Sequence, residues 1–287
     1  MIAVRLSDGL GNQLFQIAFG YSLSIKFSKE FYLTGDVHSI FSNNGDNSFI
    51  SRSFRILNLN EIDKFKRNDC FFNFKKLKFN KYQTFQELNF KYSKPNINLL
   101  HPTLFKGFWQ SEKYFIEFNN QIRLLFSGTP ILDFISTSYL NQIILCNSVA
   151  IHVRRGDYIS VPENFEKHGF CDVDYYKRAI NYLLSKEQDL SFFIFTDDIE
   201  WVRINMLPLF VNIIIVSTNN VGVDSWRDLY LMTQCKHQII ANSTFSWWGA
   251  WLNSNQHKQI IAPKNWFSNK ELNDSTGDLI PETWIRL

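Results

Sequence analysis

Residues 149–158 read VAIHVRRGDY, an apolar run that ends in a histidine and two adjacent arginines. The apolar run predicts a buried strand over 149–153, with His152 and Arg154 at its carboxyl end. A guanidinium in a largely buried place needs an anionic partner, because an unpaired buried charge costs several kcal/mol. The planar fork of donors on arginine suits phosphate oxygens. The stretch therefore predicts an anion site for a nucleotide diphosphate; the alternative is a solvated loop with a surface ion pair.

Short apolar strands alternate with helices through the rest of the second half. The patterns predict strands over 149–153, 192–195, 212–216, 238–241 and 259–262, and helices over 172–184, 198–206, 224–235 and 244–252. This alternation implies a parallel sheet covered on both faces, with Asp172 as the cap of its first helix. Ligands of such sheets lie beyond the carboxyl ends of the strands. The polar clusters 152–157, 196–198 and 241–244 are therefore expected in one crevice.

The first half begins in the same way. A strand is expected over 2–6, then the loop SDGLGNQ at 7–13, then a helix to about residue 27. Two glycines before a helix leave backbone N–H donors free for a ligand. The region 38–106 is irregular and rich in Asn and Phe. We expect an α/β protein with two Rossmann-like domains facing each other across a cleft, residues 1–140 and 141–270, with 271–287 packing back on the first.

Composition describes a globular chain: 45% of its 287 residues are hydrophobic and 20% charged. A net charge of +3 is too small to indicate nucleic-acid binding. Positive charge gathers between Lys64 and Lys81, where seven basic residues and five phenylalanines surround Asp69. This segment is either a solvated face or a patch that rests on anionic lipid or a lipid-linked substrate.

Neither the cysteines nor the apolar runs indicate secretion or a membrane span. Cys70, Cys146, Cys171 and Cys235 are widely spaced, without a zinc-binding pattern, as expected of thiols in a reducing compartment. No secretory leader precedes the first strand, and no run approaches the roughly 20 apolar residues that span a bilayer. We expect a cytoplasmic protein with at most peripheral membrane contact.

A second motif, NSTFSWWGAW at 242–251, follows a predicted strand. Ser243 is expected to cap the next helix, whose free N–H groups and dipole suit a phosphate. An ordinary cap followed by a buried aromatic face explains Ser243 and part of the tryptophans, but leaves Asn242, Thr244 and Ser246 unexplained. Upstream, Asp228 lies in a predicted helix; it is either a surface residue or an acceptor for the N1–H and amino group of guanine.

Three motifs together resemble the bacterial α-1,2-fucosyltransferases of glycosyltransferase family 11. They are GLGNQLFQ at 9–16, HVRRGDY at 152–158, and the run from Asp228 to ANSTFSWWGAWL at 241–252. A remoter resemblance links the chain to α-1,6- and protein O-fucosyltransferases through the His-x-Arg motif. The resemblance implies a GT-B-like fold, GDP-fucose as donor, no metal or other cofactor, and transfer to the 2-hydroxyl of a terminal β-galactose. The implied acceptor is an O-antigen-type or related glycan, free or lipid-linked.

The resemblance also implies roles for single residues. Arg154 would bind the β-phosphate, His152 and Asp228 would read guanine, and Asn12 would face the fucose and the acceptor. Arg155 either joins the nucleotide site or, with Asp157, holds the loop in shape. The implied nucleotide-binding set is His152, Arg154, Arg155, Asp228, Asn242, Ser243, Thr244, Phe245 and Ser246, and the implied catalytic set is Arg154, Asp157 and Asn12.

Because GDP-fucose is β-linked and the product α-linked, one inverting displacement suffices, assisted by cationic donors at the leaving phosphate. The base that accepts the proton of the acceptor hydroxyl stays open among Asp157, Asp8, Glu163 and Asp197. Three alternatives remain at this point. They are a metal-dependent transferase using the Asp172-Val173-Asp174 triplet, a fucosyltransferase of α-1,6 or O-fucosyl linkage, and a carbohydrate-binding protein without catalysis.

Overall fold

Two units divide the chain, and each is built around a parallel β-sheet. The computed structural model describes residues 1–34, 82–95, 100–127, 132–218 and 225–287. The first unit comprises Met1–Pro130 with Gly277–Leu279, and the second comprises Ile131–Thr276 with Ile280–Leu287. The basic segment between Lys64 and Lys81 lies outside the described residues.

The division between the units falls earlier than the expected break at 140/141. That break lies inside helix α6 (Phe134–Ile144). Ile143 of α6 packs in one buried cluster with Ala150 and Phe193 of the second unit. The helix therefore belongs to the second unit. Of the C-terminal segment 271–287, only Gly277–Leu279 falls in the first unit.

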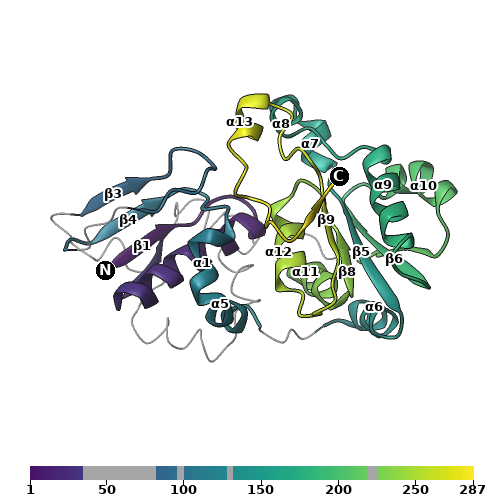
Figure 1. Cartoon of the computed structure of the whole chain (residues 1–287), viewed down its shortest axis with the longest axis horizontal. Coiled ribbons are helices and arrows are strands. Elements are labelled where there is room, and N and C mark those ends of the chain that lie inside the picture. Colours follow the sequence, from purple (N-terminus) through teal and green to yellow (C-terminus); the bar gives the residue numbers. More distant parts are fainter. Residues whose placement is uncertain (35–81, 96–99, 128–131, 219–224) are drawn as a thin grey trace. The chain divides into compact units, whose positions relative to one another are not determined.

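The described part of the first unit holds a sheet with strand order β2-β1-β4-β3, all parallel (Figure 1). Its strands alternate with helices only in part, and 38–106 is not wholly irregular as expected, because two of the strands lie in it. The elements are β1 (Ile2–Arg5), α1 (Leu10–Phe27), β2 (Phe31–Thr34), β3 (Gln83–Gln86), β4 (Thr103–Lys106), the 3-10 turns η1 (Glu112–Tyr114) and η2 (Ile116–Phe118), and α5 (Asn119–Leu125).

Helix α1 begins four residues earlier than expected, at Leu10. Gly9 is its N-cap, and the N–H groups of Asn12 and Gln13 donate to the Gly9 carbonyl at 3.0 and 3.1 Å. Gly11 is therefore a buried residue of the first helical turn, so the expectation of a glycine loop over 7–13 is wrong. Asn12, in the same turn, lies just beyond the carboxyl end of β1.

The described part of the second unit holds a sheet with strand order β10-β9-β8-β5-β6-β7, again all parallel. In chain order this is the doubly wound arrangement, and the direction of winding reverses between β5 and β8. Its elements after α6 are β5 (Asn147–Val153), α7 (Gly156–Ser160), α8 (Pro162–His168), α9 (Val173–Leu184), β6 (Leu190–Thr196), α10 (Ile199–Asn205), η3 (Leu207–Leu209), β7 (Ile213–Ile215), α11 (Ser225–Gln234), β8 (His237–Ile239), α12 (Thr244–Leu252), β9 (Ile260–Ala262), α13 (Lys270–Asp274) and β10 (Ile285–Arg286).

Every strand and helix expected in this half is present, with ends displaced by at most two residues. Asp172 caps α9 as expected, because its Oδ1 accepts a hydrogen bond from Tyr175 N at 2.7 Å. Asp198 caps α10 in the same manner through Trp201 N at 3.0 Å. The sequence patterns did not predict α7, α8, α13 or β10.

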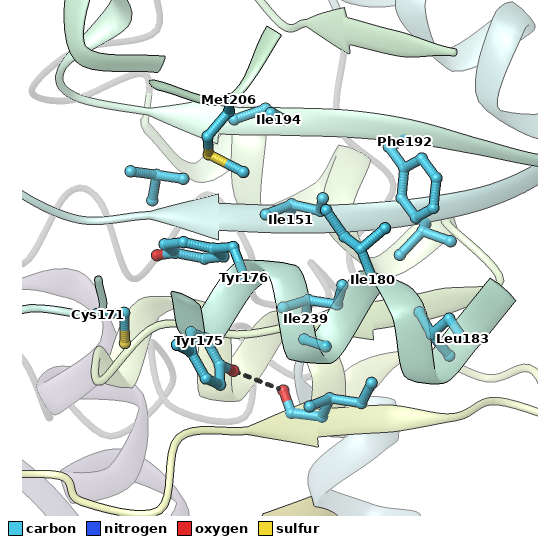
Figure 2. Packing of buried hydrophobic residues seen from close by; sticks show 14 of the residues in the cluster. Ile151, Cys171, Tyr175, Tyr176, Ile180, Leu183, Phe192, Ile194, Met206 and Ile239 are labelled. Atoms are coloured by element: carbon cyan, nitrogen blue, oxygen red, sulfur yellow. Dashed lines mark hydrogen bonds between the residues drawn. The ribbon is translucent and has the colours of Figure 1, made fainter. Parts of the chain in front are cut away.

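Two apolar layers cover the faces of this sheet, with α9 and α10 on one side and α11 and α12 on the other (Figure 1). On the first face, Tyr176 and Ile180 of α9 pack toward Ile151 of β5 (Figure 2). The Tyr175 hydroxyl donates to the carbonyl of Ile240 at 2.7 Å and also lies 3.3 Å from that of Ile261, so this buried polar group is satisfied. Alternate residues of β5 face the opposite layer, and Ala150 packs there.

Within the described ranges, no helix combines the length and the apolar character that crossing a membrane requires.

A substitution at Gly20 of α1 tests how closely this helix packs against the first sheet. A Cβ at this position would meet the ring of Phe31 and lie 2.6 Å from Val4 Cγ2. Helical Gly→Ala changes normally stabilise by about 0.5–1 kcal/mol, whereas overpacking a core costs about 1–3 kcal/mol. We expect Gly20→Ala to lower the free energy of unfolding, measured by urea titration. Gly9→Ala is the control, because no atom lies within 4 Å of its Cβ position; equal effects of the two changes would contradict the packing.

Candidate active site

His152 stands at the carboxyl end of β5, at the point where the winding of the second sheet reverses. Its side chain is 7% exposed, and its ring centroid lies 5.6 Å from that of Phe245 in the first turn of α12. The backbone carbonyl of His152 accepts the Tyr176 hydroxyl at 3.0 Å, which ties the strand end to α9. Its Nδ1 has no hydrogen-bond partner among the residues described. A buried nitrogen is thus left available at this end of the sheet.

Burial lowers the pKa of His152 to about 4; the positive charge of Arg154 also lowers it, and the carboxylate of Asp197 opposes both. The imidazole is therefore neutral at physiological pH. It stays neutral as the pH falls below 6.5, where an ordinary histidine becomes charged. A neutral imidazole carries one donor and one acceptor nitrogen, which suits recognition of a base edge.

Asp197, which follows β6, holds the loop that carries the two arginines. Its Oδ2 lies 2.7 Å from Arg154 Nη1, and its Oδ1 accepts the backbone N–H of Arg155 at 2.8 Å. A Cβ on Gly156 would lie 2.7 Å from the same Oδ2, so only glycine leaves room for the carboxylate. The guanidinium of Arg154 is 36% exposed and therefore accessible to a ligand.

Arg155 is packed into the unit and is only 12% exposed. Its Nε lies 3.1 Å from Asp198 Oδ2, and its guanidinium lies 4.3 Å from the ring centroid of Trp201 and 5.0 Å from that of Phe170. These contacts support the second of the two expected roles, that of holding the loop in shape. Its Nη1 is buried and has no partner in the described part of the chain.

In the turn from β8 into α12, the side chain of Asn242 is hydrogen-bonded to two loops, and the first turn of the helix has no side-chain cap. Asn242 Nδ2 donates to the carbonyls of His168 and Trp266 at 3.0 and 3.2 Å, so this amide binds two loops together. The carbonyl of Asn242 accepts the Tyr158 hydroxyl at 3.3 Å, which joins the turn to the arginine loop. The motifs at 152–158 and 242–246 are therefore brought together, as expected from the sheet.

Ser243 occupies the N-cap position of α12, but its side chain makes no capping hydrogen bond, so that part of the expectation is wrong. The Ser246 hydroxyl contacts the carbonyls of Ser243 and Ala241 instead, at 3.2 and 3.5 Å. Thr244 is half-buried in the first turn. The N–H groups at the start of this helix remain a suitable cradle for an anion.

Asp228 lies in the first turn of α11, and its Oδ1 accepts the Thr218 hydroxyl at 2.8 Å. Helix α11 covers the same face of the sheet as Ala150. His152 shares that face because side chains alternate along a strand. His152, Phe245 and Asp228 thus come from elements of one face of the sheet.

Of the base candidates, Asp197 has both carboxylate oxygens engaged by the arginine loop. Asp8 is exposed after β1 with a φ of 61°, and Glu163 is exposed in the first turn of α8. Asp157 lies in α7, but its side chain is outside the described part. Asn12 belongs to the first unit, where its Oδ1 accepts Gln110 Nε2 at 2.8 Å. The identity of the base stays a prediction.

Sequence reasoning missed several residues that shape the site. Phe170 and Trp201 lie against the guanidinium of Arg155, and Tyr158 joins the two motifs. An aromatic residue in a predicted helix or loop has many ordinary uses, so no sequence signal distinguished these. In the described ranges, no group of three or more His, Cys, Asp and Glu side chains is arranged to hold a metal ion.

Comparison with known proteins covers the full chain. The sequence profile of Glycosyl transferase family 11 matches residues 1–287. An α-1,2-colitosyltransferase of Escherichia coli is 36% identical over 100% of this chain and 99% of its own length. The O-antigen biosynthesis glycosyltransferase WbnK of the same species is 29% identical over 98% and 99%. Human galactoside α-(1,2)-fucosyltransferase 1 is 28% identical over 51% of this chain and 42% of its own.

The fold has solved counterparts. The α-1,6-fucosyltransferase NodZ, from a crystal soaked with GDP-fucose, superposes with a TM-score of 0.51 over 88% of this chain and 92% of its own, at 12% identity. Likeness at that identity concerns the fold alone, and it is of the GT-B-like type, with two Rossmann-like units. With the profile match along its whole length and a full-length relative above 30% identity, this chain belongs to glycosyl transferase family 11.

Proposed function

We propose that the enzyme transfers L-fucose from GDP-β-L-fucose to the 2-hydroxyl of a terminal β-galactose, with inversion. The observation that carries the proposal is the arginine loop at the reversal point of the second sheet. There an accessible Arg154 guanidinium, oriented by Asp197, lies beside a buried neutral His152. A cationic side chain that suits a diphosphate thus lies beside an uncharged side chain that suits a nucleobase. A nucleoside diphosphate has both parts. Relatives named for α-1,2-fucosyl transfer support the linkage.

In this reaction the bond between C1 of fucose and the β-phosphate oxygen breaks, and GDP leaves with the electron pair. The 2-hydroxyl oxygen of galactose forms the new bond from the opposite face and gives up its proton to a base. Arg154 would stabilise the negative charge that grows on the leaving phosphate. The N–H groups at the start of α12 would bind the diphosphate, and His152 and Asp228 would read guanine. Metal independence is part of the proposal.

A second donor is favoured by one observation. The E. coli relative that matches over the full length is named for colitosyl transfer rather than fucosyl transfer. GDP-linked colitose is therefore tested beside GDP-fucose. The acceptor is proposed to be an O-antigen-type glycan, free or lipid-linked, which the name of the second E. coli relative supports.

The deciding experiment measures transfer of labelled fucose to a panel of β-galactosides in the presence of EDTA. We expect a wild-type product that α-1,2-fucosidase cleaves. In Arg154→Ala, kcat/KM should fall by about 10²- to 10³-fold, because a donor to the developing oxyanion is lost. Arg203→Ala is the control, since within the described residues Arg203 pairs with Glu200 on the exposed surface of α10. Transfer of colitose but not fucose would show that GDP-linked colitose is the donor. Binding of GDP without transfer to any galactoside would refute the proposed acceptor class.

The neutral state of His152 has a measurable consequence for stability. Its folded pKa of about 4 lies below the ordinary 6.5, so the unfolded chain binds the extra proton first. The free energy of unfolding should therefore fall as pH drops from 6.5 toward 4, by up to about 3 kcal/mol from this group. Urea titrations across that range should show a shallower pH dependence for His152→Gln, because the carboxylates titrate in both proteins. Parallel curves would contradict a buried neutral histidine.

A further inference from the structure

Gln110 carries a buried carbonyl oxygen that has no hydrogen-bond partner. The residue follows β4 in the first unit and is 5% exposed. Its Nε2 donates to Asn12 Oδ1 at 2.8 Å, whereas its Oε1 is unpartnered in the described part of the chain. Turning the Gln110 amide alone would set two oxygens against each other, and turning both amides would again leave one donor and one acceptor unused by the pair. Buried acceptors are normally satisfied in native proteins. The orphaned oxygen therefore points to a missing donor.

The same amide pair also offers a donor. Asn12 uses its Oδ1 toward Gln110, and within the described residues its Nδ2 makes no hydrogen bond. Asn12 is half-buried in the first turn of α1, just after β1, and Gln110 lies four residues after β4. Because β1 and β4 are parallel neighbours, both residues come from the same edge of the sheet. One N–H donor and one carbonyl acceptor are thus presented together, which matches a hydroxyl that donates one proton and accepts another.

The loop that carries Gln110 is held in a strained shape. Trp109 has a φ of 56°, and its ring stacks on that of Phe19 with centroids 4.0 Å apart. The carboxylate of Glu87 accepts the N–H groups of Phe108 and Trp109 at 2.6 and 3.0 Å. Burial raises the pKa of Glu87, against the effect of those two N–H groups. Backbone strain that the surroundings maintain in this way concentrates at functional sites.

We propose that Asn12 and Gln110 bind a hydroxyl of the acceptor sugar, which makes Gln110 a specificity-determining residue. The assignment rests on the proposed function. The hydroxyl is one that does not react, because the attacking hydroxyl has to give its proton to a base, and the amide oxygen of Gln110 is too weakly basic to take it. We assign this hydroxyl to the acceptor: the charged groups suited to the nucleotide lie in the second unit, whereas the first unit offers neutral amides that suit a sugar hydroxyl.

The test compares a β-galactoside with its 3-, 4- and 6-deoxy analogues, using the wild type and Gln110→Met. Methionine keeps the length of the side chain but removes both amide groups. The wild type should use one deoxy analogue about 10-fold less well than the parent, in kcat/KM, because the two amides are then left unpaired. In Gln110→Met that difference should shrink to within about 3-fold. The melting temperature should fall less than in a variant of a fully paired buried glutamine, because Gln110→Met removes one buried unpartnered carbonyl and leaves only the half-buried Asn12 Oδ1 without its donor.

Gln16→Met is the matched control, at a glutamine of α1, the helix that carries Asn12. Gln16 is fully buried and fully paired, with Oε1 accepting Ser7 N and Nε2 donating to Ser7 Oγ and Gly107 O. Its loss should lower the melting temperature while preserving the preference among deoxy analogues. The proposal is overturned if the wild type uses all analogues equally, if Gln110→Met keeps the wild-type preference, or if it changes only the KM for GDP-fucose. Absence of wild-type transfer to the parent galactoside would refute the proposed function and this assignment with it.

Discussion

The position of the Asp197 carboxylate is the constraint on which the arginine loop of the second unit depends. It stands after β6, beside the arginine loop after β5, because neighbouring parallel strands end at one edge of the sheet. One oxygen takes the backbone N–H of Arg155, and the other takes the guanidinium of Arg154. The guanidinium is thereby oriented before any donor binds. Donors placed in advance need no reorganisation when charge develops, which is the most effective form of electrostatic catalysis.

The two units present different side-chain chemistry at the carboxyl ends of their strands. In the second unit, charge dominates: Arg154 and Arg155 are set against Asp197 and Asp198, with the neutral His152 buried among them. Charged groups suit a diphosphate, whose affinity then depends on ionic contacts. In the first unit the polar groups at the corresponding sheet edge are the amides of Asn12 and Gln110. Uncharged amides suit sugar hydroxyls, which they discriminate by geometry rather than charge.

Five strands of the second sheet and the helices α9, α10, α11 and α12 could be predicted from sequence, because the strands are apolar and α9 and α10 carry strong caps. Asp172 and Asp198 both cap the helices expected of them. Strands β3 and β4 could not be predicted, since QTFQ and TLFK are short and half polar. Motifs located the arginine loop, but the partners of its charges lie more than forty residues away. Gln110 gave no signal, because a neutral amide among aromatic residues has no distinctive pattern.

The central claim is that the arginine loop binds the β-phosphate of a guanine nucleotide, and equilibrium titration with GDP, GMP and IDP tests it most directly. GMP lacks the β-phosphate that Arg154 would bind. IDP lacks the amino group from which Asp228 would accept a hydrogen bond. Loss of a hydrogen bond to a charged group corresponds to roughly 10- to 100-fold in affinity. The account predicts that GDP binds tighter than GMP and IDP by factors of that order. Equal affinity for all three nucleotides would contradict it.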